Sequence, residues 1–287
     1  MTRSPRTSHA TRLRAMALGS ALALAATALL AAPGQAATYF ESTTRMAAQQ
    51  GGEAQVLRTR SWVDADNAKV VFVESDNPAF PEGAYLLSND GGRTLYLVNP
   101  EEKTYMVWDI SQALGALGAV MKGAGPMFKI EVSDPKVEKL ADEAGEKILG
   151  YDTHHYRFRT TYVMEMRIMG MGQASDVETV VDTWTSSALS DPGFGAWLRR
   201  DPPKTGIADL DKLMDAQIAQ GIQGVPLRMR TVSTSRDKKG RETVTTTDME
   251  VTTIRDEAPP AGAFALPAGY EEMEIPALTG SPFGNSR

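Results

Sequence analysis

The sequence predicts a mainly β domain (α+β, with few helices) built from antiparallel hairpins. Short runs rich in Val, Thr, Tyr and Phe alternate with turn residues along most of the chain. Two tight turns, at residues 89–92 and 99–102, follow one another closely, as in a meander of hairpins. Residues 153–168 alternate aromatic or methionine side chains with charged ones, which is the period of a strand with one apolar face.

The first half of the chain is expected to form consecutive strands. Residues 69–74 read Lys-Val-Val-Phe-Val-Glu and predict a strand that is buried on both faces. The strands expected before residue 110 are Thr38–Met46, Glu53–Val63, Lys69–Glu74, Gly83–Leu87, Arg93–Val98 and Lys103–Trp108.

Residues 110–122 interrupt the strand pattern with helical spacing. Apolar residues recur there at intervals of three and four, and Leu114, Leu117 and Met121 share one stripe. The remaining positions are mostly Ala and Gly, so this helix lacks the polar face of a surface helix. We expect it to be buried or to lie over an apolar surface.

Strands are expected again after residue 127, and the clearest covers residues 153–168. Its even positions share one face. The large apolar residues among them are Tyr156, Phe158, Tyr162, Met164 and Met166. The elements expected in this half are strands Phe128–Val132, Lys136–Ala141, Thr153–Ile168, Val177–Ser186, Pro226–Ser235 and Glu242–Ile254, a loop at 170–176, a short helix at 194–199 and a helix that starts near Thr205.

The first 36 residues have the layout of a secretory signal peptide. Four arginines and no acidic residue precede an uncharged run, Ala15–Ala32, that is at the short edge for spanning a ~30 Å hydrocarbon layer as an anchor. Small residues at positions −3 and −1 predict cleavage between Ala36 and Ala37. We therefore expect a periplasmic or secreted protein with no membrane span after cleavage, one domain at residues 37–276 and a loose tail at 277–287.

Processing gives the first testable prediction. The intact mass of the exported protein is expected to correspond to a chain that begins at Ala37, or within two residues of it, because the small residues before that position suit signal peptidase. Recovery of the full-length chain in the membrane fraction would contradict the prediction.

Composition disfavours several classes of function. The net charge of −6 argues against a nucleic-acid binder, which needs a basic face. The lack of cysteine excludes disulfides, thiolate metal sites and a cysteine nucleophile. Two Ser-x-x-Lys matches, at Ser133 and Ser235, do not stand at helix starts, where catalysis would need them. We expect a protein that is not an enzyme and has no cofactor.

Metal binding is the weaker alternative. His154 and His155 are adjacent on the expected strand, so they point to opposite faces and cannot bind one metal ion together. We expect His154 to line the apolar face and His155 to face solvent. Two Met-x-Met pairs, at 164–166 and 169–171, offer soft thioethers that suit Cu(I), but the same methionines could line an apolar groove. The expectation is no metal site.

Three segments together resemble a bacterial secreted domain family of unknown function. Residues 93–106, Arg-Thr-Leu-Tyr-Leu-Val-Asn-Pro-Glu-Glu-Lys-Thr-Tyr-Met, are similar to its hairpin with a Lys-Thr-Tyr sequence. Residues 150–158, followed by a strand that ends at Trp184, are similar to its central hairpin. Residues 224–228, a Thr-rich strand and then residues 264–270 resemble its C-terminal end. The fold of that family is similar to lipoprotein-carrier (LolA-like) and LppX-like proteins.

The resemblance implies a curved antiparallel half-barrel with two or three helices over its concave face. Relatives of that fold bind acyl chains, lipid-anchored proteins or regulatory partners. Many members of the closer family carry a lipidation cysteine or a cysteine in the central hairpin, and this chain has neither.

These observations predict a non-enzymatic binding protein for an apolar ligand, an acyl chain or a lipidated partner. The predicted groove lies between a strand and a helix and is lined by Tyr156, Phe158, Tyr162, Met164, Met166, Leu114, Leu117 and Met121. The alternative is a periplasmic protein-interaction or sensor domain without a small ligand, in which the same apolar face is a packed core.

Overall fold

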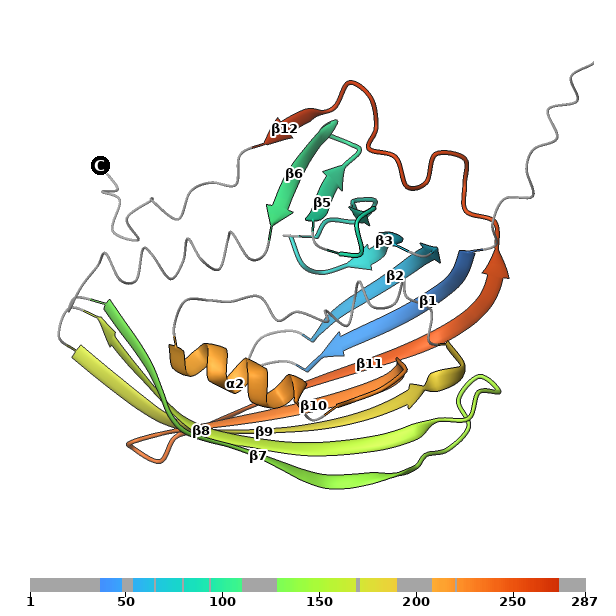
Figure 1. Ribbon diagram of the computed structural model, residues 1–287. Coiled ribbons are helices and arrows are strands. Elements are labelled where there is room, and N and C mark those ends of the chain that lie inside the picture. Colours follow the sequence, from blue (N-terminus) through green and yellow to red (C-terminus); the bar gives the residue numbers. More distant parts are fainter. Residues whose placement is uncertain are drawn as a thin grey trace, which may run out of the picture. The chain divides into compact units, whose positions relative to one another are not determined.

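The described strands of the computed structural model form one twelve-stranded sheet (Figure 1). The strand order is β12-β6-β5-β4-β3-β2-β1-β11-β10-β9-β8-β7, and within the described residues every pair is antiparallel except β12–β6. The structure describes residues 37–47, 54–64, 66–78, 80–92, 94–109, 128–168, 171–189, 208–219 and 221–273. All of them belong to one compact unit of the chain, Gln35–Arg287.

Most element bounds follow the expected strands closely, with β7, β9 and β12 as the exceptions. The strands are β1 (Ala37–Met46), β2 (Gln55–Asp64), β3 (Asn67–Ser75), β4 (Tyr85–Ser88), β5 (Thr94–Asn99), β6 (Thr104–Asp109), β7 (Phe128–Ala144), β8 (His154–Ile168), β9 (Met171–Ser186), β10 (Val225–Asp237), β11 (Glu242–Glu257) and β12 (Glu271–Met273). The helical elements are a 3-10 turn, η2 (Ser187–Leu189), and α2 (Ala208–Ile218).

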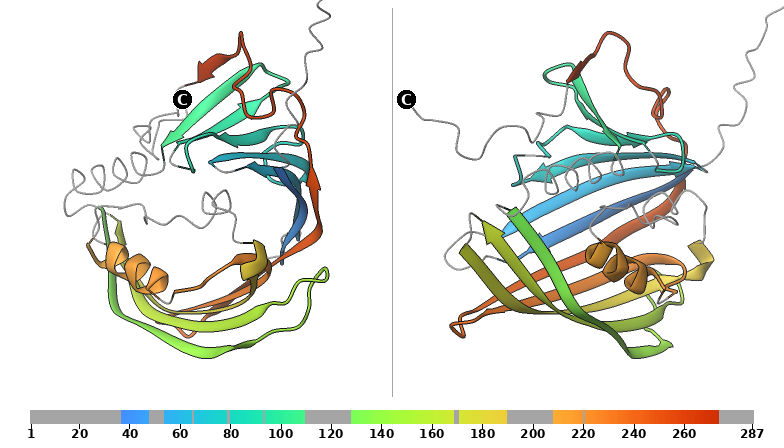
Figure 2. Two further views of the ribbon diagram at one scale, coloured as in Figure 1. Left: turned by 45° about the vertical axis from the view of Figure 1, so that its right-hand side comes forward. Right: turned by 60° about the vertical axis from the view of Figure 1, so that its left-hand side comes forward.

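The sheet is strongly curved and does not close. Figure 2 shows it as an arc, with α2 on the concave side, where α2 contacts β7. The chain after β11 crosses the convex side of β4–β6 and then adds β12 to β6 (Figure 2). The predicted mainly β architecture with one curved open antiparallel sheet is therefore confirmed.

Helices are fewer than predicted in the described part of the chain. The helix expected to start near Thr205 is α2, with Leu213 buried on it. The helices expected at 110–122 and 194–199 lie outside the described residues, so two or three helices over the concave face are not shown. None of the described helices has the length and apolar character needed to cross a membrane.

β7 is one strand where the sequence predicted two. Pro135 suggested a break, but the strand continues through it with a register shift between Ser133 and Lys136. Asp134 takes a positive φ of 53° at this bulge. Because β7 is the last strand of the sheet, the missing N–H of Pro135 costs no ladder hydrogen bond.

Two further segments differ from expectation. Residues 171–176, predicted as a loop, belong to β9, where their pairing with β8 continues from Met171 opposite Ile168. The short parallel strand β12 was not predicted, since Glu271–Met273 is exposed and lacks an apolar period. Both cases depend on a neighbouring strand and not on local residue pattern.

Both faces of the sheet carry an apolar cluster. One cluster contains Phe40, Val63, Ala68, Ile148, Val225, Leu227 and Val251, of which Phe40, Val63, Ala68 and Val251 face the concave side. The other cluster, which we call the convex cluster, contains Tyr85, Leu87 and Val98 with Phe264, Leu266 and Tyr270 packed against them. The convex cluster explains why the chain after β11 returns across β4–β6: it covers apolar side chains that the strands leave on their outer side.

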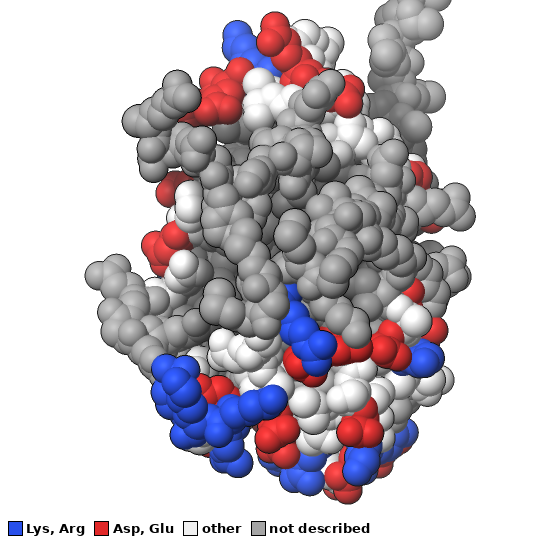
Figure 3. All heavy atoms as spheres, turned by 90° about the vertical axis from the view of Figure 1, so that its left-hand side faces the viewer, with Lys and Arg blue, Asp and Glu red and all other residues white. Residues whose placement is uncertain are grey.

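Charged side chains of both signs alternate on the convex face of β8–β11. Ion pairs link neighbouring strands there, with Arg159 Nε 3.5 Å from Glu178 and Arg228 Nη2 3.1 Å from Glu250. Figure 3 shows acidic and basic side chains intermingled over the lower part of the molecule, at the height of β7–β10 in Figure 1. A face of mixed sign does not favour a nucleic-acid backbone.

Glu41 on β1 provides a prediction about pH. The Tyr39 hydroxyl donates a hydrogen bond of 2.5 Å to its carboxylate, and Thr253 donates a second one of 3.2 Å. The hydrogen bond from Tyr39, followed by that from Thr253 and the charge of Arg60, lowers the pKa of Glu41 against the raising effect of its burial. A lowered folded-state pKa gives stability above about pH 4 that is lost as the pH falls through that pKa.

Glu41→Gln is therefore expected to reduce the loss of stability between pH 7 and pH 3. The side chain is 36% exposed, so the difference should stay below about 1 kcal/mol. Urea unfolding at both pH values measures it, with exposed Glu101→Gln as the control. An equal acid sensitivity of both variants would contradict the prediction.

Candidate functional site

The concave face holds an apolar cavity of about 440 Å³. It lies over β1–β4 and the adjoining strands β10 and β11. Its described lining residues are Phe40, Ser42, Thr44, Leu57, Thr59, Ser61, Val70, Phe72, Phe80, Leu86, Val225, Pro226, Met229, Met249 and Val251.

Strand alternation places these side chains together. Ser61 on β2 is paired with Phe40 on β1 and with Val70 on β3, so the three side chains share one face. Every second residue along each strand returns to that face, which gives Ser42 and Thr44 on β1 and Phe72 on β3. Leu86 on β4 lines the cavity, whereas its neighbours Tyr85 and Leu87 belong to the convex cluster on the other face of the strand. The cavity therefore lies on the concave face of the sheet.

The walls of the cavity are aromatic and aliphatic. The Phe72 ring meets the Phe80 ring with centroids 5.1 Å apart, and both Phe72 and Val70 are less than 5% exposed. None of the described residues that line the cavity carries a charge. Such a space favours an uncharged apolar group, because an unpaired charge in apolar surroundings is strongly disfavoured.

Hydroxyl groups are the polar feature of the cavity. Ser42 Oγ and Thr59 Oγ1 share a hydrogen bond of 2.8 Å. Ser61 is fully buried, and its hydroxyl has no hydrogen-bond partner among the described residues. A buried polar group without a partner is unusual in a folded protein and calls for an explanation.

Four of the predicted lining residues lie on the same concave face as the cavity. Phe158 is 5% exposed, and its ring is stacked against that of Tyr156 at 6.2 Å between centroids. Burial raises the pKa of the Tyr162 hydroxyl. Met164 is half-buried on the same strand. These side chains project from β8, which is separated from the cavity strands by β9.

Cross-strand pairing connects this β8 face to the cavity. Tyr156 is paired with Thr183 on β9, and Thr183 with Met229 on β10. Met229 is paired with Met249 on β11, and both methionines line the cavity. The predicted residues and the cavity therefore belong to one continuous concave surface, although the described lining of the cavity contains none of the eight.

The structure describes only some of the remaining predicted site residues. The backbone of Met166 is part of β8. Leu114, Leu117 and Met121 lie outside the described residues, as does Ala36. Ala37 begins β1 and is fully buried.

Sequence reasoning missed the residues of β1–β3 that line the cavity. The signal was present in the alternation Phe40, Ser42, Thr44 and in Val70 and Phe72. Serine and threonine at every second position made this signal weaker, because these residues usually indicate the solvent-facing side of a strand.

The histidines are placed differently from expectation. His154 is 41% exposed in its side chain and its Nε2 lies 2.6 Å from Asp142 Oδ1. His155, predicted to face solvent, is only 16% exposed; its Nε2 lies 2.9 Å from Asp182 Oδ1 and its ring stacks on Trp184 at 4.5 Å. The solvent prediction failed because Trp184, on the neighbouring strand, covers one face of the ring.

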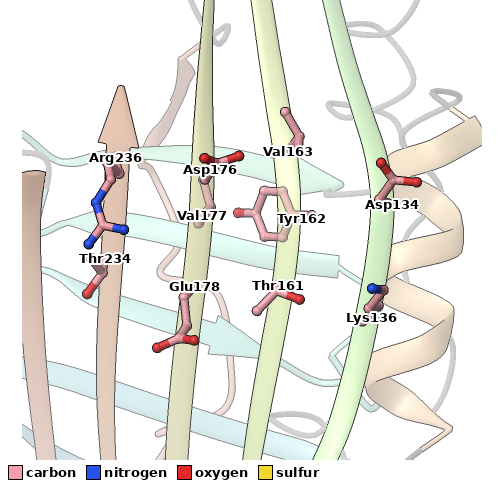
Figure 4. A pocket seen from close by; sticks show the side chains of 10 residues that line it. All are labelled: Asp134, Lys136, Thr161, Tyr162, Val163, Asp176, Val177, Glu178, Thr234 and Arg236. Atoms are coloured by element: carbon pink, nitrogen blue, oxygen red, sulfur yellow. The ribbon is translucent and has the colours of Figure 1, made fainter. Parts of the chain in front are cut away.

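A second depression, of about 480 Å³, lies on the convex side of β7–β10 (Figure 4). Paired residues Thr161 and Glu178, and Val163 and Asp176, present their side chains there. Asp176 lies opposite Arg236 on β10 in the strand register. The Arg236 guanidinium donates a hydrogen bond of 2.5 Å from Nη2 to Glu242 Oε2. The depression is open and of mixed charge, so it fits an apolar molecule less well than the concave cavity does.

Among the residues that the structure describes, no group of three or more His, Asp or Glu side chains is placed to hold a metal ion. That observation does not include methionines, so the absence of copper binding through the two Met-x-Met pairs stays a prediction.

A family model described as "Domain of unknown function (DUF4412)" matches residues 73–270. No curated protein matches the sequence. A solved structure described as PNGF-II is 15% identical with a TM-score of 0.34, and the match covers 85% of this chain and 32% of that one. This chain thus spans about a third of the length of PNGF-II.

Two further solved structures are similar over most of their length. One is an outer membrane lipoprotein-sorting protein domain from Vibrio parahaemolyticus, 10% identical with a TM-score of 0.27, and the match covers 79% of this chain and 89% of that one. The other is a DUF1329 family protein from Desulfovibrio piger, 13% identical with a TM-score of 0.28, with coverage of 80% and 91%.

Proposed function

Because the chain belongs to the family described as "Domain of unknown function (DUF4412)", whose description assigns no activity, we propose a function from the chain's own geometry. The proposed function is non-enzymatic binding of an apolar ligand, an acyl chain or the lipid group of a lipidated partner. The protein does this after export to the periplasm or beyond. The predicted family of unknown function is confirmed by the family match.

The observation that carries the proposal is the uncharged cavity of about 440 Å³ on the concave face. Its volume falls in the range of ligand pockets, roughly 300–1,000 Å³. Burial of an alkyl chain there contributes about 0.8 kcal/mol for each methylene removed from water. A chain of eight to ten carbons would therefore contribute about 6–8 kcal/mol, which exceeds the lower estimates of the entropy cost of association, about 4 kcal/mol.

The surroundings of the cavity support a ligand that is longer than the cavity itself. On the concave face, a row of paired residues runs across the strands from Met249 through Met229 and Thr183 to Tyr156, and none of the four carries a charge. Methionine and aromatic side chains adapt to varied apolar partners. The methionines at positions 164 and 166 thus have a role in this proposal that needs no metal.

Uptake of a neutral fluorescent probe tests the proposal. N-phenyl-1-naphthylamine is expected to show saturable fluorescence enhancement with the purified protein, and decanoate or methyl decanoate should displace it. Lack of saturable uptake, together with no displacement, would contradict the proposed function and favour the protein-interaction domain.

A further inference from the structure

Ser61 is the feature of the cavity that apolar binding does not explain. It is fully buried, it lines the cavity, and its hydroxyl has no hydrogen-bond partner among the described residues. A purely apolar ligand would leave this hydroxyl without a hydrogen-bond partner in the bound state. An alanine at the same strand position would avoid the free-energy cost of a buried hydroxyl without a hydrogen-bond partner.

A second hydroxyl hydrogen lies on the same wall. Ser42 and Thr59 share one hydrogen bond of 2.8 Å, so whichever of them donates, the other keeps its own hydrogen. Thr59 and Ser61 are two residues apart on β2 and face the same way. The cavity therefore offers neutral O–H donors from Ser42, Thr59 and Ser61 at neighbouring positions of β1 and β2, within a mostly aromatic and aliphatic wall.

We infer that Ser61 binds an uncharged hydrogen-bond acceptor of the ligand, such as an ester carbonyl, at one end of its apolar chain. This inference rests on the proposed function, because it concerns the polar group of a molecule in the same cavity. The uncharged lining selects the ester over a free carboxylate, since no described lining residue could neutralise a carboxylate. A carbonyl oxygen has two lone pairs and can accept from Ser61 and from the Ser42–Thr59 pair.

The test compares Ser61→Ala with a matched control, Ser186→Ala. Ser186 is also fully buried with an unpartnered hydroxyl, but it is not among the described residues that line the cavity. The ligands are methyl decanoate, tridecane (the same number of heavy atoms without the ester) and decanoate, each measured by displacement of N-phenyl-1-naphthylamine.

Ser61→Ala is expected to weaken methyl decanoate binding about fivefold to tenfold, the value of one hydrogen bond. Tridecane binding should stay within twofold, and Ser186→Ala should change neither ligand. The unmodified protein should bind decanoate more weakly than its methyl ester. Both variants should melt at or above the temperature of the unmodified protein, because each loses a hydroxyl with no partner in the described chain.

The outcomes separate the two proposals. Equal effects of Ser61→Ala on the ester and the alkane, no effect on either, or tighter binding of decanoate than of its ester would each overturn the role of Ser61 while leaving apolar binding intact. A clear drop in the melting temperature of Ser61→Ala would also overturn it, by showing that the hydroxyl is used within the protein. Failure of the unmodified protein to bind any of the three ligands would instead remove the proposed function.

Discussion

Filling the cavity is expected to abolish ligand uptake without unfolding the protein. Val70 and Val251 are 4% and 5% exposed and line the cavity from β3 and β11. The double variant Val70→Phe/Val251→Phe places two rings in a space of about 440 Å³. Affinity for N-phenyl-1-naphthylamine should fall at least tenfold, because the probe and the rings compete for the same volume. Fluorescence titration and thermal unfolding measure both effects.

The matched control is Val244→Phe on β11, at a side chain that is 48% exposed. It should leave uptake and melting temperature unchanged. If the concave face were a packed core, each new ring would overpack it and cost about 1–3 kcal/mol. Marked destabilisation of the double variant, with no uptake by the unmodified protein, would therefore identify the face as a core.

Leu87→Ala is expected to have the largest effect on stability. Leu87 is fully buried in the convex cluster, between the sheet and the chain segment that contains Phe264 and Leu266. Truncating a buried leucine removes its transfer free energy and leaves a cavity, at a cost of about 2–5 kcal/mol. That is a large part of the roughly 5–15 kcal/mol that stabilises a typical domain. Urea unfolding gives the difference directly.

The same substitution at Leu140, which is 37% exposed on β7, is the control and should cost under about 0.5 kcal/mol. A double variant with Phe264→Ala tests the packing of the C-terminal segment on the sheet. The two substitutions should show a coupling energy of roughly 0.5–3 kcal/mol, because both side chains belong to one cluster. Additive effects would show that the segment does not stabilise the convex face.

The strands were predictable where their residues alternate and where turns are marked. β8 was expected at 153–168 and is found at His154–Ile168, and the hairpins of β4–β6 follow their Asn-Asp-Gly-Gly and Asn-Pro turns. The break at Pro135 was wrong because the tolerance of a strand for proline depends on whether it lies at the edge of the sheet. That position is not visible in the local sequence.

The candidate site was predictable only in part. The apolar face of β8 follows from parity, and Phe158 is indeed buried on the concave side. The cavity, however, lies over β1–β4, where serines and threonines alternate with apolar residues. Ser61 has the same local pattern as an exposed strand serine, so its burial could not be deduced from its neighbours in the sequence.

The mainly β character and the faces of the individual strands could be read from the amino-acid sequence alone, because alternation and turn chemistry act over a few residues. The strand order, the curvature of the sheet and the position of the cavity became visible only in the folded structure. These depend on pairing between distant segments, such as Phe40 with Ser61, Ser61 with Val70, and Ser42 with Val251, more than two hundred positions further along. An unpartnered hydroxyl in an apolar cavity exists only once those segments surround it, since burial is a property of the assembled sheet.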